Sequence, residues 1–145
     1  MIALACDHNG FELMKVVKNY LKSSGHDYSD FGTFSRESCD YPAIAIPAAN
    51  DIARGDCNSG IFICGTGIGI SIVANKISGI RAAVCTSCYA AEAARRHNDA
   101  NVLALGGLVI DADLAVDIVE SFLSTDFSGD ERHRRRLSMI SELEE

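Results

Sequence analysis

The stretch Ile61-Phe62-Ile63-Cys64-Gly65-Thr66-Gly67-Ile68-Gly69-Ile70 decides the fold. It begins with a short apolar run, of the kind that forms a strand buried on both faces of a parallel sheet. The run ends at a thiol and continues into three alternating glycines, which let the backbone turn tightly. The stretch therefore predicts a strand, a glycine-rich loop and the start of a helix in direct succession.

Short apolar runs and longer amphipathic stretches alternate along the rest of the chain. The strand-like runs are 2–6, 28–31, 60–64, 81–85 and 102–105, and the helix-like stretches that follow them are 11–21, 43–53, 68–77, 90–96 and 114–123. Helices that connect parallel strands cover both faces of their sheet. We therefore expect an α/β fold, a doubly wound three-layer sandwich with a five-stranded parallel sheet, and an extra C-terminal helix over 132–143.

Length and charge narrow the class of protein. The 145 residues are 48% hydrophobic and carry a net charge of −7, and this length is close to the common size of one domain. We expect a single domain over residues 1–145. An acidic chain lacks the positive field that binds nucleic acid or anionic membranes, and no apolar run approaches the roughly 20 residues that span a bilayer. Asp7 comes too early for a signal peptide, so we expect a cytoplasmic protein.

The six cysteines are interpreted as reduced thiols, because a domain of this size builds its core without disulfides. Cys85 and Cys88 form one CxxC pair, but a zinc site needs further ligands at matching spacing. Two thiols at a strand end and a helix start are the simpler interpretation. A thiol redox protein that uses this pair is a competing hypothesis, and we expect no metal.

The glycine loop matches neither of two familiar phosphate-binding motifs. Gly65, Gly67 and Gly69 give GxGxG spacing, but Ile70 breaks the dinucleotide pattern, and the GK[ST] element of a P-loop is absent. What remains is a loop whose N–H groups can hold an oxyanion at a helix N-terminus, where a thiolate at Cys64 is also favoured. The alternative is that Cys64 is a small buried hydrophobe and the glycines serve helix–sheet packing.

Polar residues at the carboxyl ends of strands are further candidates, because ligands of such sheets bind there. Asp7 and His8 follow the first strand, where they could also be a helix cap with a surface imidazole. The polar segment 95–101 is typical of a helix C-terminus whose cations meet the dipole, which explains its arginines better than His97.

The basic run at 132–136 has three interpretations. Arg132 and Arg136 are four residues apart, share one helix face and could clamp a phosphate between two guanidinium groups. The run could also be a solvated face or a short nucleic-acid patch. Nucleic-acid binding normally needs several distributed contacts.

Motifs along the whole chain, taken together, resemble the ribose-5-phosphate isomerase B family. They occur in order and with fitting spacing, and no single one of them carries the resemblance. They are DHNG at 7–10, DYP at 40–42, CGTGIGIS at 64–71, NK at 75–76, GIRA at 79–82, HND at 97–99, NVL at 101–103, and Arg132, His133 and Arg136.

The resemblance implies an aldose–ketose isomerase of the pentose phosphate pathway that interconverts D-ribose 5-phosphate and D-ribulose 5-phosphate through an enediolate, without a cofactor. It implies Cys64 as the base, Thr66 as an aid to proton movement between oxygens, and Asp7 with His97 as the ring-opening pair. The substrate-binding residues that it implies are His8, Tyr41, Gly65, Gly67, Ile68, Gly69, Asn98, Arg132 and Arg136.

The resemblance also implies a second copy of the chain as a partner. In the family, the residues that correspond to His97 and Asn98 come from the neighbouring subunit. The expected assembly is a homodimer with shared active sites, with a tetramer of such dimers as the alternative.

Leu108 departs from the family pattern. Many members have an arginine after the fifth strand that reaches the phosphate across the interface, and leucine cannot donate a hydrogen bond. We expect a looser or rearranged phosphate site, with His133 or Arg135 as substitutes. The alternatives are an isomerase of allose 6-phosphate or galactose 6-phosphate, or a non-catalytic phosphate-binding module.

Overall fold

A parallel sheet forms the centre of the computed structural model, which describes residues 1–145. Its strands are β1 (Ile2–Cys6), β2 (Tyr28–Asp30), β3 (Ser59–Cys64), β4 (Ala82–Val84) and β5 (Val102–Gly106), in the order β2-β1-β3-β5-β4. Every neighbouring pair is parallel. All residues of β1 and β5 are buried, as expected of strands that are covered on both faces.

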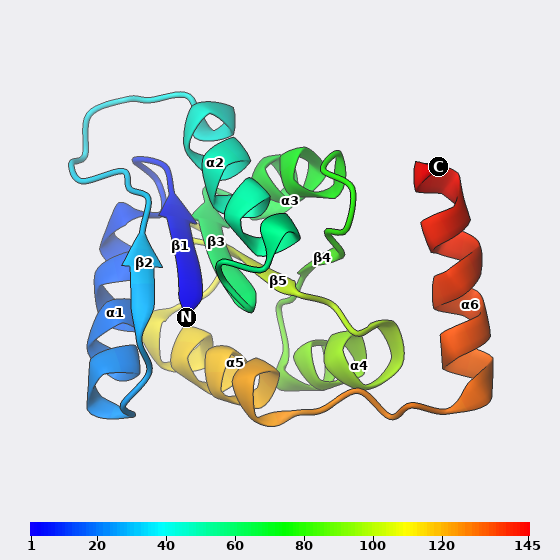
Figure 1. Ribbon diagram of the computed structural model, residues 1–145. Coiled ribbons are helices and arrows are strands. Elements are labelled where there is room, and N and C mark those ends of the chain that lie inside the picture. Colours follow the sequence, from blue (N-terminus) through cyan, green and yellow to red (C-terminus); the bar gives the residue numbers. More distant parts are fainter.

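Helices cover both faces of this sheet (Figure 1). The helices α1 (Phe11–Ser23), α4 (Cys88–Asn98) and α5 (Ala112–Ser124) pack on one face, and α2 (Tyr41–Arg54) and α3 (Ile68–Asn75) pack on the other. Helices that lead the chain toward the β2 edge lie on the first face, and those that lead toward the β4 edge lie on the second, as right-handed crossovers require. The predicted doubly wound three-layer sandwich is confirmed.

Strand β3 is fixed by packing on both of its faces. Ile61 and Ile63 face the core cluster formed with α1, α4 and α5, whereas Phe62 and Cys64 face the cluster formed with α2 and α3. All four side chains are buried, and Cys64 is 5% exposed. The packing of a rigid strand therefore holds the thiol at its carboxyl end.

The element boundaries lie close to the predicted ones. The largest differences are a fourth helix, Cys88–Asn98, that is two residues longer at each end, and a second helix that already begins at Tyr41. Pro42 occupies the first turn of that helix, where its missing N–H removes no intrahelical hydrogen bond. Asp111 caps α5 through its side chain, which accepts a hydrogen bond from the Leu114 N–H at 2.9 Å.

The C-terminal helix α6 (Glu131–Ser141) stands apart from the three layers (Figure 1). It is followed by a short 3-10 turn, η1 (Glu142–Glu144), where the Glu144 carboxylate accepts a hydrogen bond from the Gly79 N–H. His133 is the single buried residue of α6, while Met139 and Ile140 are exposed. The extra C-terminal helix is confirmed, and its apolar side is largely uncovered. None of the helices is long and apolar enough to cross a membrane.

Candidate active site

The carboxyl ends of β1 and β3 mark the point where the chain reverses its direction across the sheet. After β1 the chain leaves toward β2, whereas after β3 it leaves toward β4. Open α/β sheets bind ligands in the crevice that this divergence creates. A cavity of about 440 Å³ lies at this point. It is lined by Asp7, Asn9, Tyr41, Cys64, Gly65, Thr66, Ile68, Gly69 and Leu108.

Glycines let the loops after β1, β3 and β5 approach one another at this cavity. A Cβ on Gly10 would overlap the carbonyl group of Ile63, and a Cβ on Gly107 would overlap the carbonyl oxygen of Asn9. The Gly107 N–H also donates to the Cys64 carbonyl at 2.8 Å. Direct backbone contact between the three loops gives the cavity a rigid floor.

The thiol of Cys64 lies at the N-terminus of α3. Gly67, which precedes this helix, has a φ of +80°, and a Cβ on it would lie 2.9 Å from the carbonyl carbon of Leu105. Only glycine fits both conditions. In this conformation the Gly67 N–H donates to Cys64 Sγ at 3.2 Å.

This geometry suits negative charge in two ways. A thiolate accepts a hydrogen bond from an N–H group more strongly than a neutral thiol does. The unpaired N–H groups of the first turn of α3 and the helix dipole also favour an anion at the same place. The loop from Gly65 to Gly69 can therefore hold a thiolate and an oxyanion side by side.

Two hydroxyl groups border the cavity. Thr66 is exposed, and its Oγ1 accepts a hydrogen bond from the Ile68 N–H at 3.1 Å. The hydroxyl oxygen of Tyr41 lies 2.6 Å from the position that a Cβ on Gly69 would take. Glycine at position 69 therefore leaves the space that the Tyr41 hydroxyl occupies at the edge of the cavity.

Asp7 has two roles in the structure. Its side chain is 4% exposed, and its Oδ1 accepts hydrogen bonds from the N–H groups of Asn9 at 2.9 Å and Gly10 at 3.1 Å. Asp7 thus fixes the turn before α1 and also lines the cavity. His8 does not line it, and its Nδ1 accepts a hydrogen bond from the Cys39 N–H at 3.2 Å. In the neutral imidazole this bond leaves the ring proton on Nε2.

The other three buried cysteines do not line the cavity. Burial raises the pKa of Cys6 to about 12 and that of Cys85 to about 11, and it also raises the pKa of Cys57. Neutral thiols of this kind are inert. All six cysteines, including Cys85 and Cys88, are free thiols, and no group of three or more His, Cys, Asp or Glu side chains is placed to hold a metal ion.

The remaining predicted site residues lie at the amino ends of the strands, opposite the carboxyl ends that border the Cys64 cavity. His97 and Asn98 end α4, which leads to the amino end of β5, whereas Cys64 pairs with Gly106 at its carboxyl end. The length of β5, about 13 Å, separates the amino ends of the strands from their carboxyl ends. Neither His97 and Asn98 nor the two arginines at 132 and 136 line the Cys64 cavity.

His97 contacts His133 of α6, and the ring centroids are 4.7 Å apart. His133 is 6% exposed, and its Nδ1 lies 2.8 Å from the Ser128 Oγ. Burial lowers the pKa of His133, and the neighbouring His97 and Arg132 lower it further. A buried ring that is already hydrogen-bonded is a poor phosphate ligand, which leaves the exposed Arg135 as the other expected substitute.

Arg81 fixes the end of α4. Its Nε donates to the Asn98 carbonyl at 2.9 Å, and its Nη2 donates to the Asp99 carbonyl at 2.9 Å. Asp99 has a φ of +45°, and its Oδ1 accepts a hydrogen bond from Arg95 Nη1 at 2.9 Å. These bonds satisfy carbonyl groups that a helix C-terminus leaves free, and they hold His97 and Asn98 in place.

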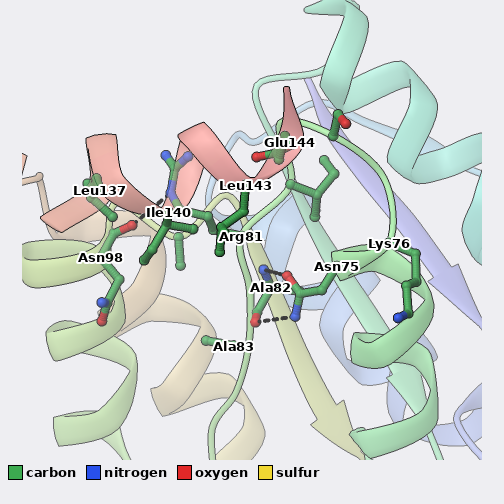
Figure 2. A pocket seen from close by; sticks show the side chains of 13 residues that line it. Asn75, Lys76, Arg81, Ala82, Ala83, Asn98, Leu137, Ile140, Leu143 and Glu144 are labelled. Carbon is green, nitrogen blue, oxygen red and sulfur yellow. Dashed lines mark hydrogen bonds between the residues drawn. The ribbon is translucent and has the colours of Figure 1, made fainter.

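A second, larger cavity of about 770 Å³ lies between α6 and the region of α3 and β4 (Figure 2). Asn98 and Arg81 border it on one side, and apolar side chains of α6 and η1 border it on the other. The Asn75 side chain, on a third side, is held by two hydrogen bonds with the backbone of Ala82, at 3.0 and 2.8 Å. The apolar residues of α6 and η1 that line this larger cavity are Leu137, Ile140 and Leu143.

The sequence interpretation omitted one residue of the Cys64 cavity. Asn9 lines the cavity, whereas the motif at 7–10 predicts roles only for Asp7 and His8. The signal was present, because Asn9 follows the first strand at the edge where ligands of such sheets bind.

Known proteins share this fold and sequence over nearly their whole length. The sequence model of the Ribose/Galactose Isomerase family matches residues 2–140. Ribose-5-phosphate isomerase B of Escherichia coli K12 is 45% identical over 144 residues, which are 99% of this chain and 96% of that protein. The solved structure of ribose-5-phosphate isomerase B from Clostridium thermocellum has a TM-score of 0.96 and 49% identity, and the match covers 99% of this chain and 96% of that one.

A relative with a different substrate in its name is nearly as similar. The 4-deoxy-4-sulfo-D-erythrose isomerase of Clostridium sp. MSTE9 is 43% identical over 128 residues, which are 88% of this chain and 80% of that protein.

These matches and the cavity at the sheet switch point define the class of protein, an aldose–ketose isomerase that acts on sugar phosphates. The chain belongs to the Ribose/Galactose Isomerase family, and within it to the ribose-5-phosphate isomerase B group.

Proposed function

We propose that this chain interconverts D-ribose 5-phosphate and D-ribulose 5-phosphate through an enediolate, with Cys64 as the base. The observation that carries the proposal is the position of the Cys64 sulfur, which lies 3.2 Å from the Gly67 N–H inside the cavity at the switch point. The named relatives that isomerise ribose 5-phosphate support the choice of substrate.

In the proposed reaction, Asp7 and His97 first open the furanose ring to expose the aldehyde at C1. The Cys64 thiolate then removes the proton from C2, and negative charge develops on the oxygens bonded to C1 and C2. Thr66 moves a proton between these oxygens, and Cys64 returns its proton to C1. Each well-placed N–H group of the loop from Gly65 to Gly69 stabilises the enediolate by roughly 3 kcal/mol.

We infer that a second copy of the chain completes each site. The sheet separates Cys64 from His97 and Asn98, so one chain cannot bring them to one substrate. The exposed apolar side of α6 and the large cavity beside Asn98 give the second copy a surface to occupy. The end of α4 and the start of α6 form a corner, the α4–α6 corner, that carries His97, Asn98, Arg132 and Arg136. In a twofold dimer, each copy would contribute this corner to the Cys64 cavity of the other.

The phosphate would bind to His8 of one copy and to Arg132 and Arg136 of the other. Both arginines are exposed and lie on one face of α6. Tight binding of this remote group positions the sugar carbons over the thiol. Leu108, which is 73% exposed at the edge of the cavity, adds no charge to this clamp.

Leu108 also favours a second candidate, an aldose that carries a sulfonate. A sulfonate has one negative charge, whereas a phosphate monoester has almost two near neutral pH, so the absence of an arginine costs a sulfonate less binding energy. The relative named for 4-deoxy-4-sulfo-D-erythrose supports this candidate. Allose 6-phosphate and galactose 6-phosphate remain the six-carbon candidates.

Steady-state kinetics on these sugars tests the proposal, with Cys64→Ala as the variant and Cys85→Ala as the matched control. We expect turnover of ribose 5-phosphate that EDTA does not change. Cys64→Ala should lose about 10²- to 10⁴-fold in kcat while it still binds the sugar, because a positioned base contributes that much. Cys85 lies outside the cavity, so Cys85→Ala should keep its kcat.

Other outcomes would change the assignment. Preference for a six-carbon or sulfonated sugar would move the substrate and keep the mechanism. Retention of activity by Cys64→Ala would refute the cysteine base. No turnover of any of these sugars, with phosphate binding intact, would favour the non-catalytic phosphate-binding module.

We place the reaction in the cytoplasm. Phosphorylated sugars are charged and do not cross membranes unaided, so an enzyme that uses them works where they are made. Six free thiols suit a reducing compartment.

A further inference from the structure

Asn9 holds a fixed position at the edge of the Cys64 cavity. Its N–H donates to Asp7 Oδ1 at 2.9 Å, and Gly107 packs directly against its carbonyl oxygen. The side chain is exposed, and no hydrogen bond within the chain engages its carboxamide. The backbone of Asn9 is thus rigid, whereas the polar end of its side chain is free to bind a ligand.

Asn9 and Leu108 meet over Gly65. A Cβ on Gly65 would lie 3.4 Å from Asn9 Nδ2 and 3.5 Å from Leu108 Cδ1, so the two side chains border the same small space. That space is next to Cys64, because Gly65 is its neighbour in the chain and lines the same cavity. One border is apolar, and the other has an amide that can both donate and accept hydrogen bonds.

We propose that Asn9 is a substrate-contacting residue that helps to set sugar preference, because its carboxamide hydrogen-bonds a sugar oxygen held over Gly65 beside Cys64. This inference rests on the proposed function, since it requires a sugar at the thiol. A site that hydrogen-bonds a hydroxyl group discriminates strongly against substrates that lack it. Asn9 therefore supplies selectivity on the side of the cavity where Leu108 cannot.

The test uses Asn9→Ala, Asn9→Asp and the matched control Asn19→Ala, which removes an exposed asparagine from α1. For Asn9→Ala we expect a loss of about tenfold in kcat/KM for ribose 5-phosphate with an unchanged Tm, the effect of one hydrogen bond to substrate. Asn9→Asp should lose about a hundredfold, because its carboxylate would repel the enediolate. Asn19→Ala should match the wild type in both measurements.

Inhibition by inorganic phosphate identifies the part of the substrate that Asn9 contacts. If Asn9 binds a sugar oxygen, the inhibition constant of phosphate stays the same in Asn9→Ala. A parallel weakening of phosphate inhibition would overturn the assignment to a sugar oxygen. A kcat/KM of Asn9→Ala within twofold of the wild type would overturn the whole inference.

These results are separable from a failure of the proposed function. If Cys64→Ala abolishes turnover and Asn9→Ala leaves it unchanged, the proposed function stands and the role of Asn9 is refuted. If the wild-type chain turns over none of the sugars, the proposed function fails, and the inference about Asn9 is overturned with it.

Discussion

The Cys64 cavity and the α4–α6 corner are built in opposite ways. The cavity is made of loops that touch through glycines, and one chain supplies all of its floor. The corner carries the half-buried His97 and the exposed Asn98, Arg132 and Arg136, and it lies next to an uncovered apolar helix side. The floor of the first region is complete within one chain, whereas we propose that the second region acts together with the cavity of another chain.

This difference assigns different tasks to the two regions. A rigid floor with fixed N–H groups suits the stabilisation of charge that develops during the reaction, because such groups need no rearrangement. Exposed arginines on a helix suit the capture of a phosphate. We therefore expect changes in the cavity to reduce kcat and changes at Arg132 and Arg136 of the corner to raise KM.

The largest effect that sharpens this comparison is expected from Gly67→Ala. The positive φ and the close approach to Leu105 oppose any side chain there, so this variant should lose about 1–3 kcal/mol of unfolding free energy. The displaced N–H should also lower kcat about a hundredfold. Denaturant unfolding and steady-state kinetics measure the two losses.

Gly25→Ala is the matched control for that variant. Gly25 has a φ of +75°, but a Cβ there would meet no atom within 4 Å. It should lose a similar or smaller unfolding free energy and keep its full kcat. Equal kcat losses in the two variants would show that activity tracks stability and not the N–H group at Cys64.

A smaller effect is expected in the corner. Arg132→Ala or Arg136→Ala should raise KM for ribose 5-phosphate about tenfold and leave kcat within a few-fold, because each removes one charge from the phosphate clamp. Arg134→Ala, on the same helix, is the control, since the Arg134 side chain donates to the Gly129 carbonyl at 2.7 Å. A loss of kcat without a change in KM would place the arginines in the chemical step.

The smallest effect concerns the pH dependence of stability near His133. Its lowered pKa means that the unfolded chain binds a proton more readily than the folded chain. Stability should therefore fall as the pH drops below the ordinary histidine value of about 6.5. His133→Asn should lose less unfolding free energy between pH 7.5 and 5.5 than the wild type, as denaturant unfolding at both pH values would show. An identical loss in both chains would mean that another group causes the acid sensitivity.

The sequence predicted the cavity better than the corner, for physical reasons. Local signals identify Cys64 and the glycines, because a strand followed by a glycine turn fixes its own geometry. His97 and Asn98 end a helix that leads into the next parallel strand, which places them at the amino ends of the strands, but no local pattern shows which cavity they would serve. The place of Asn9 after the first strand was a signal for the cavity, but its contact with Gly65, which is distant in the chain, is visible only in the structure. A single domain over 1–145 stays a prediction.

Subunit complementation tests the central claim most directly, which is that the cavity of one chain and the corner of another form each site. Cys64→Ala and His97→Asn are each expected to be inactive alone. Mixed and re-associated, they should recover about a quarter of wild-type activity, because half of the random dimers are hybrids with one intact site of two. No recovery, despite hybrid dimers detected by native mass spectrometry, would show that each site lies within one chain and would contradict the account.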